Sequence, residues 1–104
     1  MRSGRGANMN VDELDAFVDE GIRVAIKNRY DPTVFQGMRA RHGTVGAIEK
    51  LVLSGEIQSG FKRLRDLGLL EWSIETAVLK FPGRFSRNAQ ECAKFRLDQA
   101  TTHA

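Results

Sequence analysis

The sequence predicts an all-α fold, a single compact domain of about five to six short helices after a disordered leader. Three observations lead to this fold class. The 104 residues are enough for one domain to bury its own core. Apolar residues recur three and four positions apart, and capping residues alternate with glycine or proline stops at short intervals. We therefore expect a disordered leader (residues 1–9), one helical domain (residues 10–100) and a disordered tail (residues 101–104).

Composition and charge narrow the class of protein. The 16 basic and 13 acidic residues leave a net charge of +3, which is only a faint indication of an anionic partner. No apolar run approaches the roughly 20 residues of a membrane span, and the leader lacks the apolar stretch of a secretory signal. A single cysteine, Cys92, excludes a disulfide framework and fits a reducing compartment. We expect a cytoplasmic protein without a membrane segment.

The first helix is predicted over residues 11–28. Asn10 is a suitable N-cap, and Glu13 stands three residues later, as in a capping box. Acids gather on the face opposite the apolar stripe, and bases crowd the end of the segment, where the helix dipole favours them. The apolar face contains Val11, Leu14, Phe17, Val18, Ile22, Ala25 and Ile26.

Two further helices are predicted on either side of Gly43. Asp31 is the expected N-cap of the earlier helix, with Pro32 at its first position, where a missing N–H does no harm. Gly43 is expected to end that helix. Thr44 then caps a helix that ends near residues 54–55 and buries Val45, Ile48, Leu51 and Val52.

Short helices are also predicted before Gly68 and after Ser86. The earlier one starts at Gln58 or Ser59, and its inner face contains Phe61, Leu64 and Leu67. Its outer face is charged and contains Lys62, Arg63, Arg65 and Asp66. The helix after Ser86 places Ala89, Cys92, Ala93, Arg96 and Leu97 on one face.

Residues 72–81 are ambiguous between helix and strand. Trp72, Ile74, Thr76 and Val78 alternate with other residues as they would in a strand. However, Ser73 is a good N-cap, and the Pro-Gly pair at residues 82–83 is a typical terminator, which indicates a short helix.

A strand here would make residues 44–85 resemble a winged helix that binds nucleic acid. Groove-reading helices need exposed polar side chains that are flanked by cations near the phosphates. The groove-facing candidates are Gln58, Ser59, Lys62 and Arg63, and the phosphate-facing candidates are Arg65, Lys80, Arg84 and Arg87. Arg39 and Arg41 could assist. The same pattern is also typical of an amphipathic helix with a glycine stop.

Residues 30–97 contain a characteristic set of apolar and glycine positions. The pattern comprises Phe35, Met38, Gly43, Ala47, Leu51, Gly60, Phe61, Leu64, Gly68, the run of residues 70–79, Phe85 and residues 93–97. In these positions the chain resembles a family of small bacterial proteins that has no assigned function. The resemblance implies a helix after Ser73 and implies no catalytic residue or ligand. Trp72 and the acidic first helix depart from the family pattern.

Side chains that could carry chemistry are few and scattered. His42 stands before a predicted helix stop, where the dipole stabilises a cationic ring, and His103 lies in the predicted tail. Cys92 is expected to be a small core thiol. Glu71 and Glu75 are expected to lie on a solvated face near a helix start. No metal-ligand spacing or phosphate-binding loop occurs, so we expect no catalytic residue, no cofactor, no metal and no enzyme activity.

Two functions remain for such a domain. The favoured prediction is a non-catalytic protein-interaction module, which binds a protein partner or a second copy of itself and uses Glu71 and Trp72 as candidate contact residues. The alternative is a helix-turn-helix-like protein that binds nucleic acid through Lys62, Arg63 and Arg65.

Overall fold

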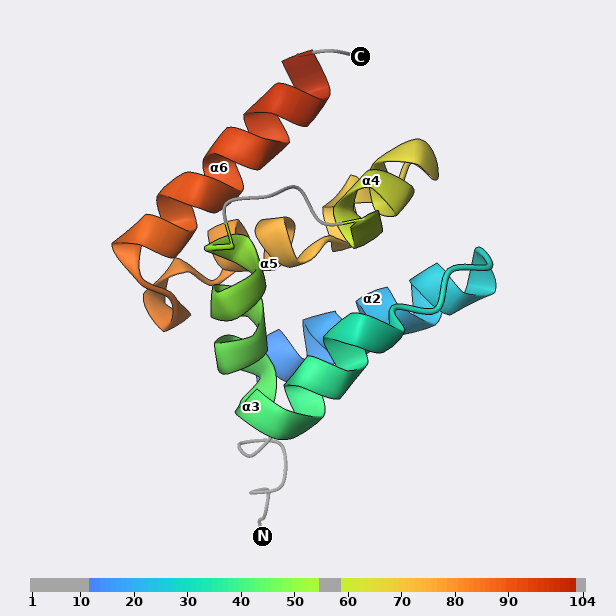
Figure 1. Cartoon of the computed structure of the whole chain (residues 1–104), viewed down its shortest axis with the longest axis horizontal. Helices are drawn as coiled ribbons and strands as arrows, with labels where there is room; N and C mark the ends of the chain where they lie inside the picture. The colour runs from blue at the N-terminus through green and yellow to red at the C-terminus, as the bar shows by residue number, and fades with distance from the viewer. Residues whose placement is uncertain (1–11, 55–58, 103–104) are drawn as a thin grey trace, which may run out of the picture.

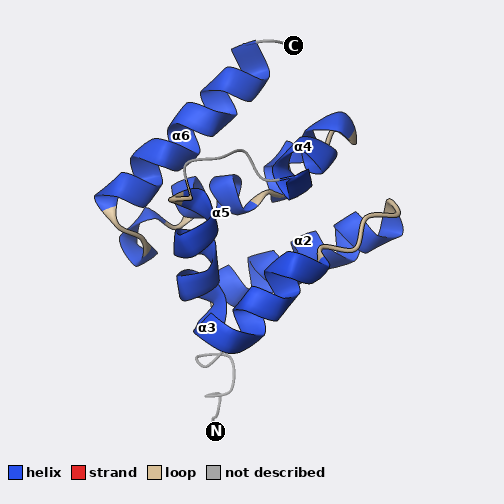
Figure 2. Ribbon diagram, in the orientation of Figure 1, coloured by secondary structure: helices blue, strands red, loops and turns tan. Residues whose placement is uncertain are grey.

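A computed structural model describes residues 12–54 and 59–102 of the chain. These residues form only helices and turns, with no strand among them (Figure 2). The elements are α2 (Glu13–Lys27), α3 (Thr33–Val52), α4 (Ser59–Asp66), the 3-10 turn η1 (Leu70–Trp72), α5 (Ile74–Lys80), the 3-10 turn η2 (Pro82–Arg84) and α6 (Arg87–Thr102). The all-α prediction is therefore confirmed. The predicted leader, residues 1–9, lies outside the described residues.

The seven-residue helix α5 lies at the centre of the fold (Figure 1). It contacts α2, α3, α6 and both 3-10 turns. Ser73 caps it, because the Ser73 hydroxyl accepts a hydrogen bond from the Thr76 amide at 3.1 Å. The wing-strand hypothesis for residues 72–81 is therefore wrong: the local cap and stop outweigh the alternation of β-branched residues.

Helix α2 begins later than predicted. Its N-cap is Asp12, whose carboxylate accepts hydrogen bonds from the amides of Leu14 (2.8 Å) and Asp15 (3.3 Å). Glu13 is thus the first helical residue and cannot close a capping box with Asn10, which lies outside the described residues. An aspartate at this position also brings a negative charge to the helix N-terminus, where the dipole favours it.

Helix α3 contains the break that the sequence predicts at Gly43. This residue has a φ of +81° and a ψ of 169°, so the helical run Thr33–Val52 is kinked there. The prediction of Asp31 as N-cap is wrong: Pro32 occupies that position, and the Asp31 carboxylate instead accepts a hydrogen bond from the Gln36 side-chain amide at 2.7 Å. The Thr44 hydroxyl binds Arg39 and Asp15 rather than capping the second half.

The later boundaries follow the predicted signals closely. Gly68 has a φ of +73°, which suits a chain reversal after α4. Ser86 opens α6, because its hydroxyl accepts a hydrogen bond from the Ala89 amide at 3.1 Å. The predicted tail begins too early, since residues 101 and 102 still belong to α6. Residues 103 and 104 lie outside the described part.

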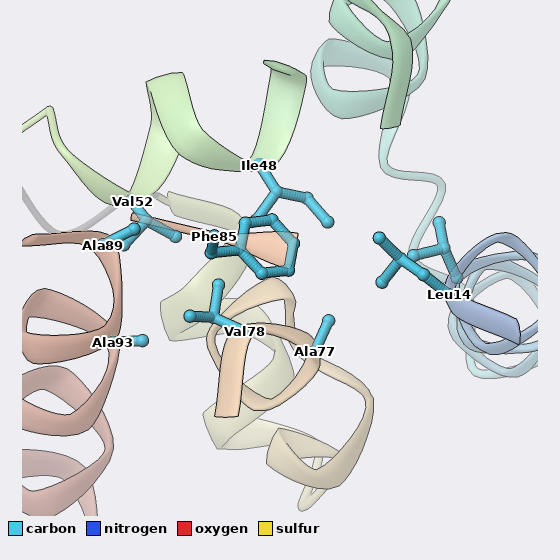
Figure 3. Close-up of a cluster of buried hydrophobic side chains, with 9 residues drawn as sticks. Leu14, Ile48, Val52, Ala77, Val78, Phe85, Ala89 and Ala93 are labelled. Atoms are coloured by element: carbon cyan, nitrogen blue, oxygen red, sulfur yellow. The ribbon is translucent and has the colours of Figure 1, made fainter. Parts of the chain in front are cut away.

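The main core joins α2, the second half of α3, α5, Phe85 and α6 (Figure 3). Its buried members are Leu14, Val18, Ile48, Val52, Ala77, Val78, Phe85, Ala89 and Ala93. Phe61 of α4 is also buried but does not belong to this cluster. Helix α4 therefore packs at the periphery, against η1. Among the described residues, no helix has the length and apolar character needed to cross a membrane.

Candidate functional site

A cavity of about 330 Å³ lies where α4 and η1 approach α2 and the first half of α3. Five aromatic side chains contribute to its wall, which is mostly apolar: Phe17, Tyr30, Phe35, Phe61 and Trp72. Val34 also contributes to the wall although it is 71% exposed, so it lies at the edge of the cavity. A mostly apolar cavity of this size, open on one side, is typical of binding pockets for small groups.

The α2 side of the wall is built by an aromatic stack. The rings of Phe17 and Trp72 are 5.1 Å apart between centroids, with planes 28° apart. Gly21 makes this approach possible, because a Cβ there would lie 3.2 Å from the Trp72 carbonyl oxygen. Trp72 is therefore half-buried in the wall and not a freely exposed anchor, whereas Glu71 beside it is exposed.

The α4 side of the wall depends on a second glycine. A Cβ at Gly60 would lie only 2.5 Å from the Tyr30 hydroxyl oxygen, so glycine allows Tyr30 to pack against α4. Burial raises the pKa of Tyr30, although the nearby charge of Arg63 opposes this shift. The neutral phenol is thus favoured over the phenolate at this side of the cavity.

Glu75 is a buried part of the cavity wall, not a residue of a solvated face. It is 1% exposed, and its Oε2 accepts a hydrogen bond from Arg96 Nη1 at 2.7 Å. The other oxygen, Oε1, is buried and has no hydrogen-bond partner among the described residues. Burial raises the pKa of Glu75, although the hydrogen bonds from Arg96 and from the Glu75 backbone amide oppose this shift. The prediction of a solvated Glu75 is therefore wrong.

Arg96 lies on the packing face of α6, as predicted. It is 6% exposed, and its Nη2 lies 3.4 Å from both the Leu51 carbonyl and the Ser54 hydroxyl. This guanidinium thereby joins α6 to α5 and to the end of α3. The sequence carries a signal for the burial of Glu75. This residue stands three positions before Val78, so the two side chains share a face of α5, and Val78 is fully buried.

Most of the cations proposed to bind nucleic acid contact acids or an aromatic ring. Arg65 pairs with Asp66, Arg84 with Asp12 and Arg87 with Glu91. Arg39 binds Asp15 and Asp19 of α2. The Lys80 ammonium lies 5.7 Å from the centre of the Phe17 ring, and Arg41 is exposed.

Lys62 and Arg63 are exposed on α4 and make no salt bridge within the described residues. Arg63 donates a long hydrogen bond, 3.5 Å, to the Arg29 carbonyl. Figure 1 places α4 on the opposite side of the molecule from η2 and the start of α6, so the candidate cations are dispersed. Gln58 lies outside the described residues, and Ser59 is the first residue of α4.

The remaining reactive side chains do not gather into a second site. His42 is exposed directly before the Gly43 kink, and Cys92 is half-buried on α6. His103 lies outside the described residues. Within the described ranges, no three His, Cys, Asp or Glu side chains are arranged to hold a metal ion.

Comparison with known proteins finds no relative: no family model, curated protein or solved structure matches this chain. The resemblance to a family of small bacterial proteins therefore stays a prediction.

Proposed function

We propose that this protein is an interaction module without catalytic chemistry, and that an apolar side chain of a different polypeptide binds in the cavity between α2, α3, α4 and η1. The observation that carries the proposal is the mostly apolar cavity of about 330 Å³ with Val34 exposed at its edge. Protein interfaces draw most of their binding free energy from a few large side chains that enter such pockets.

The construction of the wall supports a preformed site. The Phe17–Trp72 stack and the close approach of Tyr30 to Gly60 fix the aromatic side chains in place. A partner then does not have to order these rings, which reduces the entropy lost on binding. The half-buried Trp72 contributes as part of the pocket. Glu71 beside it in the sequence is exposed and is available to a polar contact with the partner.

Substitution at Val34 tests the proposal. A random peptide library displayed on phage is selected against the full chain, and enriched peptides are measured on Val34→Asp and Phe95→Asp. Both side chains are exposed (71% and 64%), so both variants should fold, but only Val34 contributes to the cavity wall. We expect Val34→Asp to weaken peptide binding about tenfold or more, because a charge at the edge opposes apolar entry. We expect Phe95→Asp to bind as the unaltered chain does.

Two results would overturn the proposal. Absence of enriched peptides, or equal losses in the two variants, would show that the cavity is not the binding site. Sedimentation of the full chain addresses the other occupant: a dimer that dissociates in Val34→Asp would identify a second copy, not a different polypeptide.

The alternative function, nucleic-acid binding through Lys62, Arg63 and Arg65, is favoured by one observation: Lys62 and Arg63 are exposed on α4 without an acidic partner among the described residues. Titration with duplex and single-stranded oligonucleotides at low salt tests it. The variant K62A/R63A should reduce the salt dependence of binding by about one unit of log-log slope for each phosphate that the protein no longer neutralises. The matched control, K50A/K94A, removes the same charge elsewhere and should not. Absence of binding at low salt would contradict this alternative.

A further inference from the structure

Glu75 is a residue of the cavity wall, and one of its two carboxylate oxygens has no hydrogen-bond partner from another described residue. Arg96 Nη1 donates to Oε2 at 2.7 Å, while Oε1 is buried and has no partner among the described residues. A buried acceptor without a donor lowers the stability of the fold, because it has lost its hydrogen bonds to water. A group that brings a donor to Oε1 would recover that loss on binding.

We propose that the partner side chain bound in this cavity is a tryptophan, whose indole N–H donates to Glu75 Oε1. This inference rests on the proposed function, since it identifies the side chain that the cavity accepts. The indole rings would contact the aromatic wall, where edge-to-face and offset stacked arrangements are favourable. A volume of about 330 Å³ suits one bicyclic group better than a whole helix.

The charges at the wall favour a neutral donor over a cation. Arg96, at 6% exposure, already supplies the positive charge that balances Glu75. The side chains of the wall include Asp31 and Glu75 but no lysine or arginine. A lysine or arginine anchor that reached Glu75 would have to leave water and would lie beside the Arg96 guanidinium, and both effects are unfavourable.

The number of donors and acceptors favours indole over phenol. An indole has one N–H donor and no acceptor, so one hydrogen bond to Oε1 satisfies it completely. A tyrosine hydroxyl would also bring acceptor lone pairs into a largely apolar wall. Because Oε1 exposes almost no surface, entry of the ring requires a small shift of wall side chains, as is common when partners bind.

Matched small probes test the inference on the unaltered full chain. Indole, 1-methylindole and naphthalene have similar rings, but only indole has an N–H. Their dissociation constants are measured by chemical-shift titration of the labelled protein. We expect indole to bind about tenfold tighter than either other probe, because a hydrogen bond to a charged acceptor contributes at least this much. On ring size and apolar surface alone, 1-methylindole would bind as well or better.

Variants identify which acceptor is used. Tyr30, Thr33 and Asp31 are also wall residues with side-chain acceptors, whereas the Ser73 hydroxyl is already bound to Thr76. Tyr30→Phe, Thr33→Val and Asp31→Asn remove these three acceptors one at a time. The preference for indole should persist in all three variants. Loss of the preference in any one of them would assign the bond to that residue and overturn the inference. The direct substitution Glu75→Gln removes the counter-charge of Arg96 and is a secondary test, used only if its circular dichroism matches the unaltered chain.

The outcomes separate this inference from the proposed function. Equal binding of the three probes would overturn the tryptophan assignment but leave an apolar binding site. Failure of all three probes to shift residues of the cavity wall would also overturn the assignment. The peptide selection with Val34→Asp then decides the proposed function independently.

Discussion

Two arginines each bind carboxylates of a neighbouring helix, and they do so in opposite surroundings. Arg39 of α3 binds Asp15 and Asp19 of α2, with side-chain exposures of 22%, 46% and 53%. Arg96 of α6 binds Glu75 of α5, with exposures of 7% and 1%. The chemistry of the two contacts is the same, but water solvates the acids of the first and is excluded from the second.

The difference in solvation changes what each contact contributes. Exposed ion pairs typically stabilise a protein by only about 0–1 kcal/mol, because water and salt screen them. In a buried pair, attraction between the charges is offset by the cost of removing both from water. A buried pair is therefore sensitive to removal of one partner and tolerant of removal of both. We expect the Glu75–Arg96 contact to behave as a buried pair and the Arg39 contacts to behave as exposed pairs.

The largest effect is expected from Arg96→Met. This change leaves Glu75 buried without its counter-charge, and we expect it to reduce the free energy of unfolding by about 3–5 kcal/mol at neutral pH. Urea denaturation followed by circular dichroism measures the loss. The loss should shrink toward acidic pH, where Glu75 binds a proton. A loss below about 1 kcal/mol would show that the Glu75–Arg96 contact contributes no more than an exposed pair.

Replacing both partners should reverse most of that loss. The double variant Glu75→Leu with Arg96→Met exchanges the charges for apolar side chains of comparable length. Such exchanges are often neutral or stabilising by about 1–4 kcal/mol. A double-mutant cycle of urea denaturation curves measures the coupling. Additive losses in the two single variants would show that the side chains do not act as a pair.

A smaller effect is expected from pH. Burial raises the pKa of Glu75 above 4.5, against the opposing Arg96 hydrogen bond. The folded chain then holds this proton more tightly than the unfolded chain. Its contribution to stability is full below pH 4.5 and is lost as the pH rises through the native pKa. The free energy of unfolding is measured from pH 4 upward for both proteins. As the pH rises, it should fall more for the unaltered chain than for the double variant Glu75→Leu with Arg96→Met.

Asp12 should give stability the opposite pH dependence to that of Glu75. The hydrogen bond from Arg84 is the largest cause that lowers the pKa of Asp12 below 3.8. Its contribution to stability is therefore present above pH 3.8 and is lost as the pH falls through the native pKa. Asp12→Asn should remove this acid-side dependence and leave the dependence due to Glu75 unchanged. The opposite result would mean that the two dependences are wrongly assigned.

The smallest effect is expected from Arg39→Met, which keeps the apolar stem and removes the exposed charge. We expect a loss of about 1 kcal/mol or less, which added salt reduces further. Denaturation in low and high salt measures it. A loss as large as that of Arg96→Met would show that the Arg39 contacts behave as buried ones.

Local signals in the sequence predicted most of the helix boundaries. Ser73 and Ser86 cap the helices that follow them, and Gly68 ends α4, as their positions in the sequence predict. Such signals can be read locally, since a cap or a left-handed turn depends on the nearest few residues. The sequence alone does not separate Asp12 from Asn10 as the cap of α2, because both residue types suit the position. The contact between Asp12 and Arg84 depends on tertiary structure and cannot be read from local spacing.

The candidate site could not be predicted in the same way. Glu75 and Arg96 are 21 residues apart, and their pairing depends on how α5 packs on α6. The cavity arises where η1 packs on α2 and where α4 approaches Tyr30, and no spacing along the chain specifies these contacts. The sequence did identify Trp72 as a residue of interest, but its half-buried state depends on Phe17 and Gly21.

The kink at Gly43 has a consequence for how the molecule opens locally. It separates the first half of α3, whose Arg39 binds α2, from the second half, whose Ile48 and Val52 belong to the main core. Segments joined through a break of this kind can unfold as distinct cooperative units. We expect native-state hydrogen exchange to show faster opening of residues 33–42 than of residues 44–52. The helix that looks continuous in the fold would then exchange as two.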